Sequence, residues 1–439
     1  MVHQMMNKKS ASAMPASKNM THMMSIVRPE ILNSRGPIMV KTGLAQGVES
    51  ARFTVRSIGR HLGQFLTWLL VSTSLLLSST AWAVGPQAKI RPIGFHELPG
   101  WSSDGLHDFW PALMGNCSVM RQRITSWAKV CKASEQISDS DASAVRQFVE
   151  TWFTPHEITD AKGTRSATVT GYYEPLLRGS RVREGAFQIP LYRTPKDLVN
   201  VDLSSIYPEI KALRLRGRLE GNRVVPYPTR EEIEKKGLLA GHELLWVDDA
   251  VEAFFLQVQG SGRVVLPNGE TVRVGYAEQN GYPYRSIGRY LIDKGELKPN
   301  DASMQSIKRW MAANPHRRDE VLHQNPSVVF FKEIGNLKSN LGPLGSMGLP
   351  LTPRRSVAVD PRYVMPGSLV FLSTRVPNVG AAPRDPGQPF QQLMIAQDTG
   401  SAILGPHRSD IFFGTGNEAG DVAGRMRSEG QMFVLLPNP

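Results

Sequence analysis

Cysteine is scarce in this chain of 439 residues: Cys117 and Cys131 are the only two, and they lie close together in the sequence. With so few cysteines and ten scattered histidines, no ligand spacing typical of a zinc site occurs, so we expect neither a metal nor a cofactor. In an exported protein, a disulfide that closes this short loop is the favoured state of the pair. Two buried free thiols are the alternative.

Runs of basic residues are also missing, although Lys and Arg outnumber Asp and Glu by 51 to 39. Residues 1–83 hold nine Lys/Arg and two Glu, so they account for +7 of the formal net charge of +12 and leave +5 on the rest. A mildly basic surface favours an anionic polymer, whereas nucleic-acid binding needs a much stronger basic patch. We therefore expect no nucleic acid among the partners.

No apolar run reaches the about 20 residues that a membrane-spanning helix needs. The run from Phe65 to Leu77 follows several arginines and ends before Ala-Trp-Ala at 81–83. A basic flank, an apolar core and an Ala-x-Ala end predict a signal peptide over 61–83, cleaved after Ala83, and an uncleaved anchor is the alternative. No Cys follows the run to accept a lipid. Residues 1–60 predict a disordered extension, or a start codon upstream of the true one.

About 356 residues remain after this leader, which suggests two domains. Apolar residues at three- and four-residue steps predict helices over 104–160, with a helix cap at 138–142. Over 176–335, Gly and Pro separate short apolar runs, which predicts a small β domain with a hairpin at Asn268-Gly269. Near the end of this region, helices are predicted over 286–292, 304–311 and 316–324. Residues 336–439 are dense in predicted strands.

Residues 336–439 contain three aspartates that are candidates for an active site. We predict that Asp360, Asp398 and Asp410 all lie at the ends of apolar strands. Asp398 and Asp410 also lie in a stretch with several glycines, which allow close approach to the backbone. Carboxylates in such a setting indicate the floor of an active site. The alternative is that these aspartates only cap turns, as Asp often does.

Two other stretches suit sugar recognition. Tyr172-Tyr173 offers aromatic faces that match the C–H face of a pyranose, although tyrosine in a half-buried strand is the commoner explanation. Gln259-Gly-Ser-Gly262 is a glycine turn that exposes an amide to hydroxyl groups, and a simple hairpin would look similar. It is not a phosphate loop, because neither a Lys-Ser/Thr pair nor a long helix is expected after it.

The C-terminal segments VAVDPRYVMPGSLVF, AQDTGSAILG and RSDIFFGTGNEAG resemble the three-aspartate (3D) domain. With TGYYEP, VQGSGRV, YAEQNGYPYRSIG and NPSVVFF before them, the chain resembles the membrane-bound lytic transglycosylase A (MltA) family of murein transglycosylases. The resemblance runs from about Phe95 to Pro437, with several motifs in the same order, and is therefore specific.

The resemblance implies a mainly β protein with some helices. Residues 84–175 and 336–439 would form a double-psi β-barrel, and 176–335 a smaller inserted β-barrel-like domain, with a groove between them for a peptidoglycan glycan strand. It also implies a monomer in the periplasm of a Gram-negative bacterium, associated with the outer membrane and with cell-wall synthesis or division complexes. The best-known members are lipoproteins, so the missing acceptor Cys favours a soluble periplasmic form here.

The activity implied is cleavage of the β-1,4 bond between MurNAc and GlcNAc, with formation of 1,6-anhydro-MurNAc. The family's catalytic aspartate matches Asp410, and Asp398 matches its companion. The substrate-binding positions implied by the motifs are Asp360, Thr170, Gly171, Tyr172, Tyr173, Gln259, Gly260, Ser261, Gly262, Tyr284 and Ser286.

In such a reaction the substrate's own O6 attacks C1, so one carboxyl can serve first as acid and then as base. Asp410 must then begin protonated, and either the apolar Ile411-Phe412-Phe413 or a like charge on Asp398 would raise its pKa. Asp398 would position or tune Asp410, or stabilise oxocarbenium-like charge.

Three other functions fit parts of the sequence. A lysozyme-like hydrolase would use a second carboxylate as nucleophile. A non-catalytic module would use the same aspartates only to bind cell-wall glycan. Asp398-Thr399-Gly400 also matches the aspartic-peptidase signature, but that mechanism needs two aspartates that share a proton, and one such motif is present.

Overall fold

The computed structural model describes residues 88–439 except 107, 139–140, 211–212, 214, 336–337, 339 and 381–384. The chain divides into two compact units, and every described helix and strand belongs to the second, Ser79–Pro439. The predicted extension and signal peptide, residues 1–83, lie outside the described residues. Within the described part, no helix is long and apolar enough to cross a membrane.

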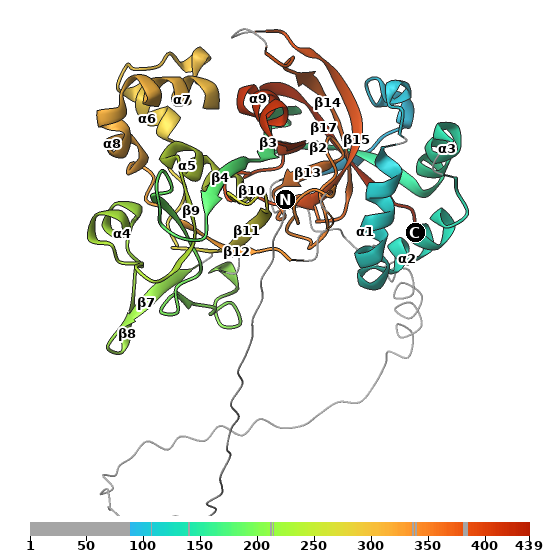
Figure 1. The fold of residues 1–439 in the computed structure, drawn as a ribbon. Coiled ribbons are helices and arrows are strands. Elements are labelled where there is room, and N and C mark those ends of the chain that lie inside the picture. The colour runs from blue at the N-terminus through green and yellow to red at the C-terminus, as the bar shows by residue number, and fades with distance from the viewer. Residues whose placement is uncertain are drawn as a thin grey trace, which may run out of the picture. The chain divides into compact units, whose positions relative to one another are not determined.

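A closed β-barrel is formed by strands from both ends of the described chain (Figure 1). Around the ring, each strand pairs with the next in the order β17, β14, β15, β13, β16 and β3, and β3 pairs again with β17. Two of these pairs, β13–β15 and β16–β3, are parallel. Strand β3 comes before the insert in the sequence and the other five ring strands come after it, so this barrel is assembled from both ends of the described chain. The ring strands are β3 (Ser166–Glu174), β13 (Ser356–Val359), β14 (Leu369–Val376), β15 (Gln388–Asp398), β16 (Arg408–Thr415) and β17 (Arg427–Pro437).

The barrel interior is filled by aliphatic side chains that alternate along each strand, as period-two burial requires. All six ring strands contribute to this core, which includes Val169, Val357, Val370, Met394, Ile411 and Val434. Beyond the ring, β2 (Phe153–Thr159) pairs with β17, and β1 (Lys89–Pro92) pairs with β2. The side chains that alternate with the interior ones point outward. The barrel therefore has an outer face, which is either covered by other elements or left for a functional site.

Helices cover one half of this outer face. They are α1 (Phe109–Arg123), α2 (Thr125–Ser134) and α3 (Ala142–Trp152), and they bury a second core against β14, β15 and β17. The helices predicted over 104–160 are therefore present up to Trp152, but the prediction is wrong for the end of that range, where residues 153–159 form strand β2. Asp141 caps α3 by accepting hydrogen bonds from the backbone N–H groups of Ser143 and Ala144. A disulfide between Cys117 and Cys131 joins α1 to α2.

The inserted domain lies between β3 and β13 in the sequence and contains two sheets. The larger has the strand order β12-β11-β10-β4-β9-β5, and the smaller is β6-β7-β8. Asn268-Gly269 lies at the β10–β11 turn as predicted, with Gly269 at a φ of 85°. The strands are β4 (Leu176–Ser180), β5 (Ile189–Tyr192), β6 (Val199–Asn200), β7 (Arg216–Glu220), β8 (Arg223–Val225), β9 (Glu243–Val247), β10 (Ser261–Val265), β11 (Thr271–Gln279) and β12 (Val329–Glu333).

Helices of the insert pack around its larger sheet. The predicted helices occur as α6 (Ile287–Asp293), α7 (Met304–Ala313) and α8 (Arg318–Leu322), and Ser303 caps α7. Two more, α4 (Arg230–Lys236) and α5 (Ala250–Gln259), lie where the sequence predicted only strands. In α5, one side packs on the sheet through Leu256 and another packs on α6–α8 through Phe254 and Phe255, so it lacks the polar face that gives a helix its usual period.

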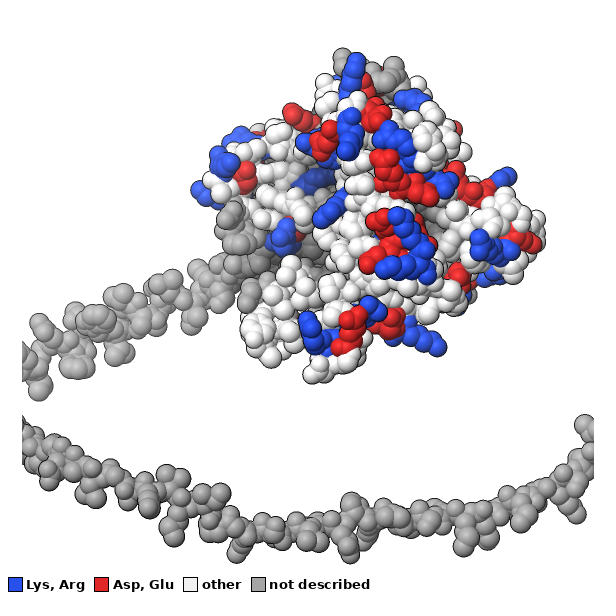
Figure 2. Space-filling view, turned by 90° about the vertical axis from the view of Figure 1, so that its left-hand side faces the viewer, with Lys and Arg blue, Asp and Glu red and all other residues white. Residues whose placement is uncertain are grey.

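Charged side chains on the insert side of the molecule lie mostly beside charges of opposite sign (Figure 2). Arg317 pairs with both Glu296 and Glu320, and Arg181 pairs with Glu333. On this face, the described basic side chains do not gather into one broad patch.

Two sets of contacts tie the insert to the barrel. Glu174, at the end of β3, is buried, accepts a 2.7 Å hydrogen bond from Thr415 of β16 and forms an ion pair with Arg263 of β10. At α7, the Gln305 amide donates to the backbone oxygens of Gly420 and Asp421 in α9 (Asn417–Arg425). These contacts fix both the connecting strand and the outer helices of the insert.

Candidate active site

Asp410 lies on the half of the barrel's outer face that α1–α3 leave uncovered. It is the third residue of β16, so the prediction that it ends a strand is wrong: the apolar residues that follow it continue the same strand. Its neighbours across the sheet are Thr170 in β3 and Ala358 in β13. The Thr170 hydroxyl donates a 2.7 Å hydrogen bond to the Asp410 carboxyl, which is partly exposed.

Asp398 reaches the same outer face because β15 contains a bulge. Ala396 pairs with Val357 of β13, whereas Asp398 pairs with the next residue, Ala358, so Gln397 is an extra residue. The Gln397 amide is buried and accepts a 2.6 Å hydrogen bond from Ser356, which holds the bulge in place. A β-bulge turns the following side chain to the other face of a sheet. Without it, Asp398 would follow Ala396 toward the barrel interior.

Ala358 therefore lies between the two aspartates, with Asp398 on one neighbouring strand and Asp410 on the other. Two inter-strand spacings put their Cα atoms roughly 9–10 Å apart. No hydrogen bond joins the two carboxyls in the described structure, so they do not share a proton as the aspartic-peptidase mechanism requires.

The two carboxyl groups differ in their hydrogen-bond partners. Asp398 accepts from the backbone N–H groups of Ser346 and Thr399, at 2.9 and 2.8 Å, and from the Tyr172 hydroxyl at 2.9 Å. A carboxyl that accepts three donors is suited to the charged state, because an ionised carboxylate only accepts. Asp410 has one donor, Thr170, and its other oxygen is left for a proton.

Both aspartates have raised pKa values. Burial raises the pKa of Asp410 to about 6, with a further contribution from the negative charge of Asp398, against the opposing effects of Thr170 and Arg408. Burial also raises the pKa of Asp398, while its hydrogen bonds lower it. The apolar surface behind the carboxyls is a small cluster of Tyr172, Leu351, Ala358, Ile403 and Phe412.

Asp360 does not face this site. Its side chain is 2% exposed, binds the Arg362 guanidinium and accepts a 2.7 Å hydrogen bond from the backbone N–H of Gly405. Burial raises its pKa, but these hydrogen bonds outweigh that effect and the net pKa is lowered. The residue thus connects the end of β13 to the β15–β16 loop, and its oxygens are occupied by the protein rather than open to substrate.

The tyrosine pair is buried rather than displayed. Tyr172 is 9% exposed and packs on Phe412, and Tyr173 is 5% exposed. Little ring surface remains for sugar stacking, so packing of the two rings around β3 is the better explanation of the pair. The backbone N–H of Tyr173 donates to the Gln259 side chain, which is therefore occupied as well. Gly171 is required by packing, because a Cβ there would lie 2.5 Å from the Phe413 ring.

The remaining candidates for substrate contact have structural explanations. Gly260 ends α5 at a φ of 81°, and a Cβ on Gly262 would lie 2.3 Å from Leu256. Ser286 caps α6, and Tyr284 packs against the core around that helix. Ser261 is the first residue of β10. Of the positions carried over from the motifs, Thr170 and Tyr172 are the two that contact the aspartates.

Sequence reasoning missed two functional neighbours. Ser346, in the loop before β13, donates to Asp398, and no sequence signal marks it. Arg408 acts on Asp410 through its charge, and its position two residues earlier in the same strand could have revealed it, since such residues share a face.

The site does not coincide with a cavity that lies beside the β1–β2 extension of the barrel sheet. This cavity of about 710 Å³ is lined by residues of β1, β2 and β17 and by the start of α2, and it contains none of the three aspartates. Among the described residues, no cluster of three His, Cys, Asp or Glu is placed to hold a metal ion.

Comparison with known proteins decides the family. The model of the MltA specific insert domain matches residues 168–332, and the model of the 3D domain matches 355–436. The membrane-bound lytic murein transglycosylase A of Escherichia coli (strain K12) is 33% identical over 333 residues, which cover 75% of this chain and 79% of that protein. This chain belongs to the MltA family.

Solved MltA-like structures share the fold. The lytic transglycosylase LtgG of Burkholderia pseudomallei is 43% identical, covers 82% of this chain and 99% of its own, and superimposes with a TM-score of 0.54. The E. coli MltA structure with bound chitohexaose is 30% identical, covers 81% of this chain and 93% of its own, and has a TM-score of 0.56. The barrel and insert described above are therefore the MltA architecture.

Proposed function

We propose that this MltA family member cleaves the β-1,4 bond between MurNAc and GlcNAc in peptidoglycan and leaves a 1,6-anhydro-MurNAc end. The observation that carries the proposal is the unequal bonding of two neighbouring carboxyls: Asp398 accepts three hydrogen bonds, whereas Asp410 accepts one. One carboxyl is held ready for the charged state, and the other is left able to carry and release a proton.

In this mechanism Asp410 begins protonated and donates to the glycosidic oxygen as the bond to C1 breaks. The O6 hydroxyl of the same MurNAc attacks C1, and Asp410 then accepts the proton that O6 loses. The reaction is intramolecular, so no water is consumed and the substrate supplies the oriented nucleophile. Asp398, as a carboxylate on the adjacent strand, stabilises the positive charge that develops at the sugar ring.

The substrate class and the cellular setting rest on relatives. The E. coli relative binds chitohexaose, which supports a glycan strand as the ligand here. Its name describes it as membrane-bound. For this chain we propose that the leader at 61–83 directs export to the periplasm and that residues 176–335 form the inserted domain. We also propose that the protein acts as a monomer and associates with cell-wall complexes.

Analysis of products by mass spectrometry tests the function. Purified sacculi are digested with residues 84–439, which contain every described element, and the released muropeptides are compared with those from a lysozyme digest. Muropeptides lighter by one water than the hydrolase products are expected. Reducing-end products would make the enzyme a hydrolase, and no released product would make it a glycan-binding module.

The pH profile provides a separate prediction through Thr170. Asp410 must be protonated to act as the acid, so kcat/KM is expected to fall as the pH rises through about 6. The hydroxyl of Thr170 stabilises the charged form of Asp410, so Thr170→Val is expected to raise the pKa and move this falling limb to higher pH.

The matched control for this profile is Thr168→Val, on the same face of β3 and two residues from Thr170, with its side chain exposed. It is expected to leave the limb where the wild-type enzyme has it. A limb that stays fixed in Thr170→Val, or moves to lower pH, would show that Asp410 is not the titrating acid.

A further inference from the structure

The segment that runs from β6 to β8, residues 199–225, carries an unusual share of the exposed hydrophobic surface. Of the fifteen large hydrophobic side chains that are exposed in the described part of the chain, seven lie between residues 203 and 224. The β7–β8 hairpin projects at the end of the insert that is far from the barrel (Figure 1). These side chains are therefore not part of the site around Asp410.

The sequence of the hairpin is that of a strand with one face meant to be covered. Residues 213–220 read Leu-Arg-Leu-Arg-Gly-Arg-Leu-Glu, and such an alternation normally marks a strand that lies on a core. In the structure this face is open. Leu219 is 61% exposed, and its cross-strand partner Val224 is 50% exposed.

The exposed aliphatic residues form one continuous surface. A Cβ on Gly217 would lie 2.7 Å from a methyl group of Val224, so the valine leans over the glycine between Leu215 and Leu219. We call Leu215, Gly217, Leu219 and Val224 the aliphatic hairpin face. Contiguous apolar surface on a projecting element indicates an interaction site, unlike single exposed residues.

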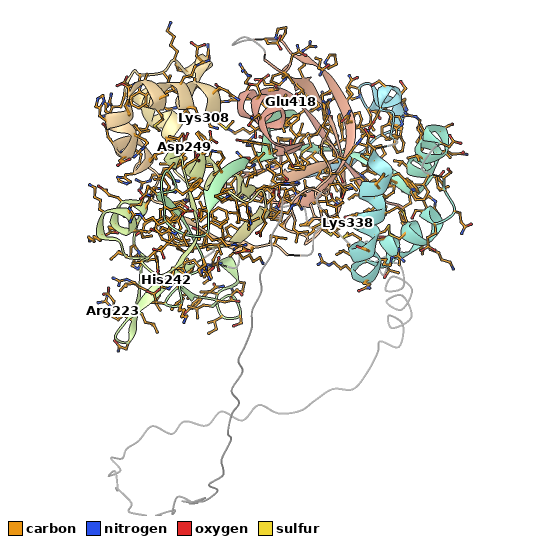
Figure 3. All side chains as sticks on the ribbon, viewed as in Figure 1. Arg223, His242, Asp249, Lys308, Lys338 and Glu418 are labelled. Carbon is orange, nitrogen blue, oxygen red and sulfur yellow. A yellow bond between two sulfur atoms is a disulfide. The ribbon has the colours of Figure 1, made fainter. Side chains whose placement is uncertain are left out.

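Basic side chains accompany this face. Arg218 and Arg223 lie on the opposite side of the hairpin, because they alternate with Leu219 and Val224. Arg218 forms an ion pair with Glu220, whereas the Arg223 side chain is exposed. Arg223 is the first residue of β8 and lies near the end of the hairpin (Figure 3). Residues 199–225 contain five Lys/Arg against three Asp/Glu, so the element is cationic as well as apolar.

We propose that the β7–β8 hairpin docks on the surface of an anionic phospholipid bilayer. The aliphatic hairpin face enters the interfacial region, and the exposed Arg223 extends to the headgroup phosphates, as long basic side chains do beside buried apolar surface. A narrow tip of two short strands offers much less than the about 800 Å² per partner of a standard protein interface. A lipid surface, in contrast, adapts to a small convex element.

Co-sedimentation with vesicles tests the proposal. Residues 84–439 are used, since the apolar leader would itself enter lipid. They are expected to bind vesicles of phosphatidylethanolamine and phosphatidylglycerol, to bind phosphatidylcholine vesicles more weakly, and to dissociate as salt is raised. The double variant Leu219→Ser/Val224→Ser is expected to bind at least about tenfold more weakly, because it removes the apolar contacts.

Val182→Ser is the matched control, because Val182 is 58% exposed on the insert but lies outside β6–β8. It is expected to bind as the wild type does, and all variants are expected to retain cleavage of isolated glycan strands. The proposal is overturned if the wild type does not bind anionic vesicles, or if the double variant binds them equally well. If the double variant lost binding to sacculi but still bound anionic vesicles as the wild type does, the hairpin would contact a cell-wall polymer, and this result would also overturn the proposal.

Discussion

Asp410→Asn is expected to lower the rate of glycan cleavage by roughly 10²- to 10⁴-fold, the range measured for loss of a general acid–base group. Asn has the shape of Asp and can still accept the 2.7 Å hydrogen bond from Thr170, so the strand geometry is preserved. It cannot, however, give a proton to the leaving oxygen or take one from O6. The measurement is the rate of anhydromuropeptide release from sacculi, with circular dichroism to verify folding.

Asp398→Asn separates the roles of the two carboxyls. Removal of its negative charge lowers the pKa of Asp410, so the falling limb of the pH profile is expected to move to lower pH, with a loss of rate. Asp319→Asn, an exposed site on α8, is expected to behave as the wild type. An inactive Asp398→Asn with an active Asp410→Asn would reverse the assignment of acid and companion.

Arg355→Met is expected to lower the free energy of unfolding by about 3–5 kcal/mol, the cost of removing one member of a buried ion pair. The Arg355 guanidinium binds both oxygens of Asp104, at 2.8 and 2.9 Å, and both side chains are almost fully buried. Asp104 also accepts from the backbone N–H of Leu393 in β15. The variant would leave a carboxylate without its counter-ion between the helical segment and the barrel. Urea denaturation measures the effect.

Two companion variants interpret that result. The double variant Asp104→Leu/Arg355→Met leaves no uncompensated charge, so part of the lost stability is expected to return. Arg121→Met removes an exposed pair with Glu135 and is expected to cost less than about 1 kcal/mol. If Arg355→Met lowered the free energy of unfolding by no more than Arg121→Met does, the buried ion pair would not be the contact that holds Asp104 against the barrel.

Local features were predictable because they depend on neighbours in the sequence. The cap within residues 138–142, the Asn268-Gly269 turn and the helices α1–α3, α6 and α7 were all expected from spacing and residue type. The helix α5 was missed because it is apolar on more than one side, between the sheet and α6–α8, and its sequence has no clear period.

The candidate site was predicted in identity but not in arrangement. The motif around Asp410 pointed to the acid, yet Asp360 was grouped with it although its side chain is buried against Arg362. Tyr172 was considered as a sugar-stacking residue or as part of a half-buried strand, and its hydrogen bond to Asp398 was not predicted. In each case the sequence indicated which residue matters, but it did not indicate which residues that side chain contacts.

The sequence by itself therefore determined the family, the two chain segments that build the barrel, and the aspartates worth testing. The tertiary structure alone decided which carboxyl is free to carry a proton. That distinction depends on Thr170, which lies 240 positions from Asp410, on Tyr172, which lies 226 from Asp398, and on a bulge that turns Asp398 outward. Periodicity and turn chemistry act over a few residues, whereas the pKa of a carboxyl is set by whatever the fold brings beside it.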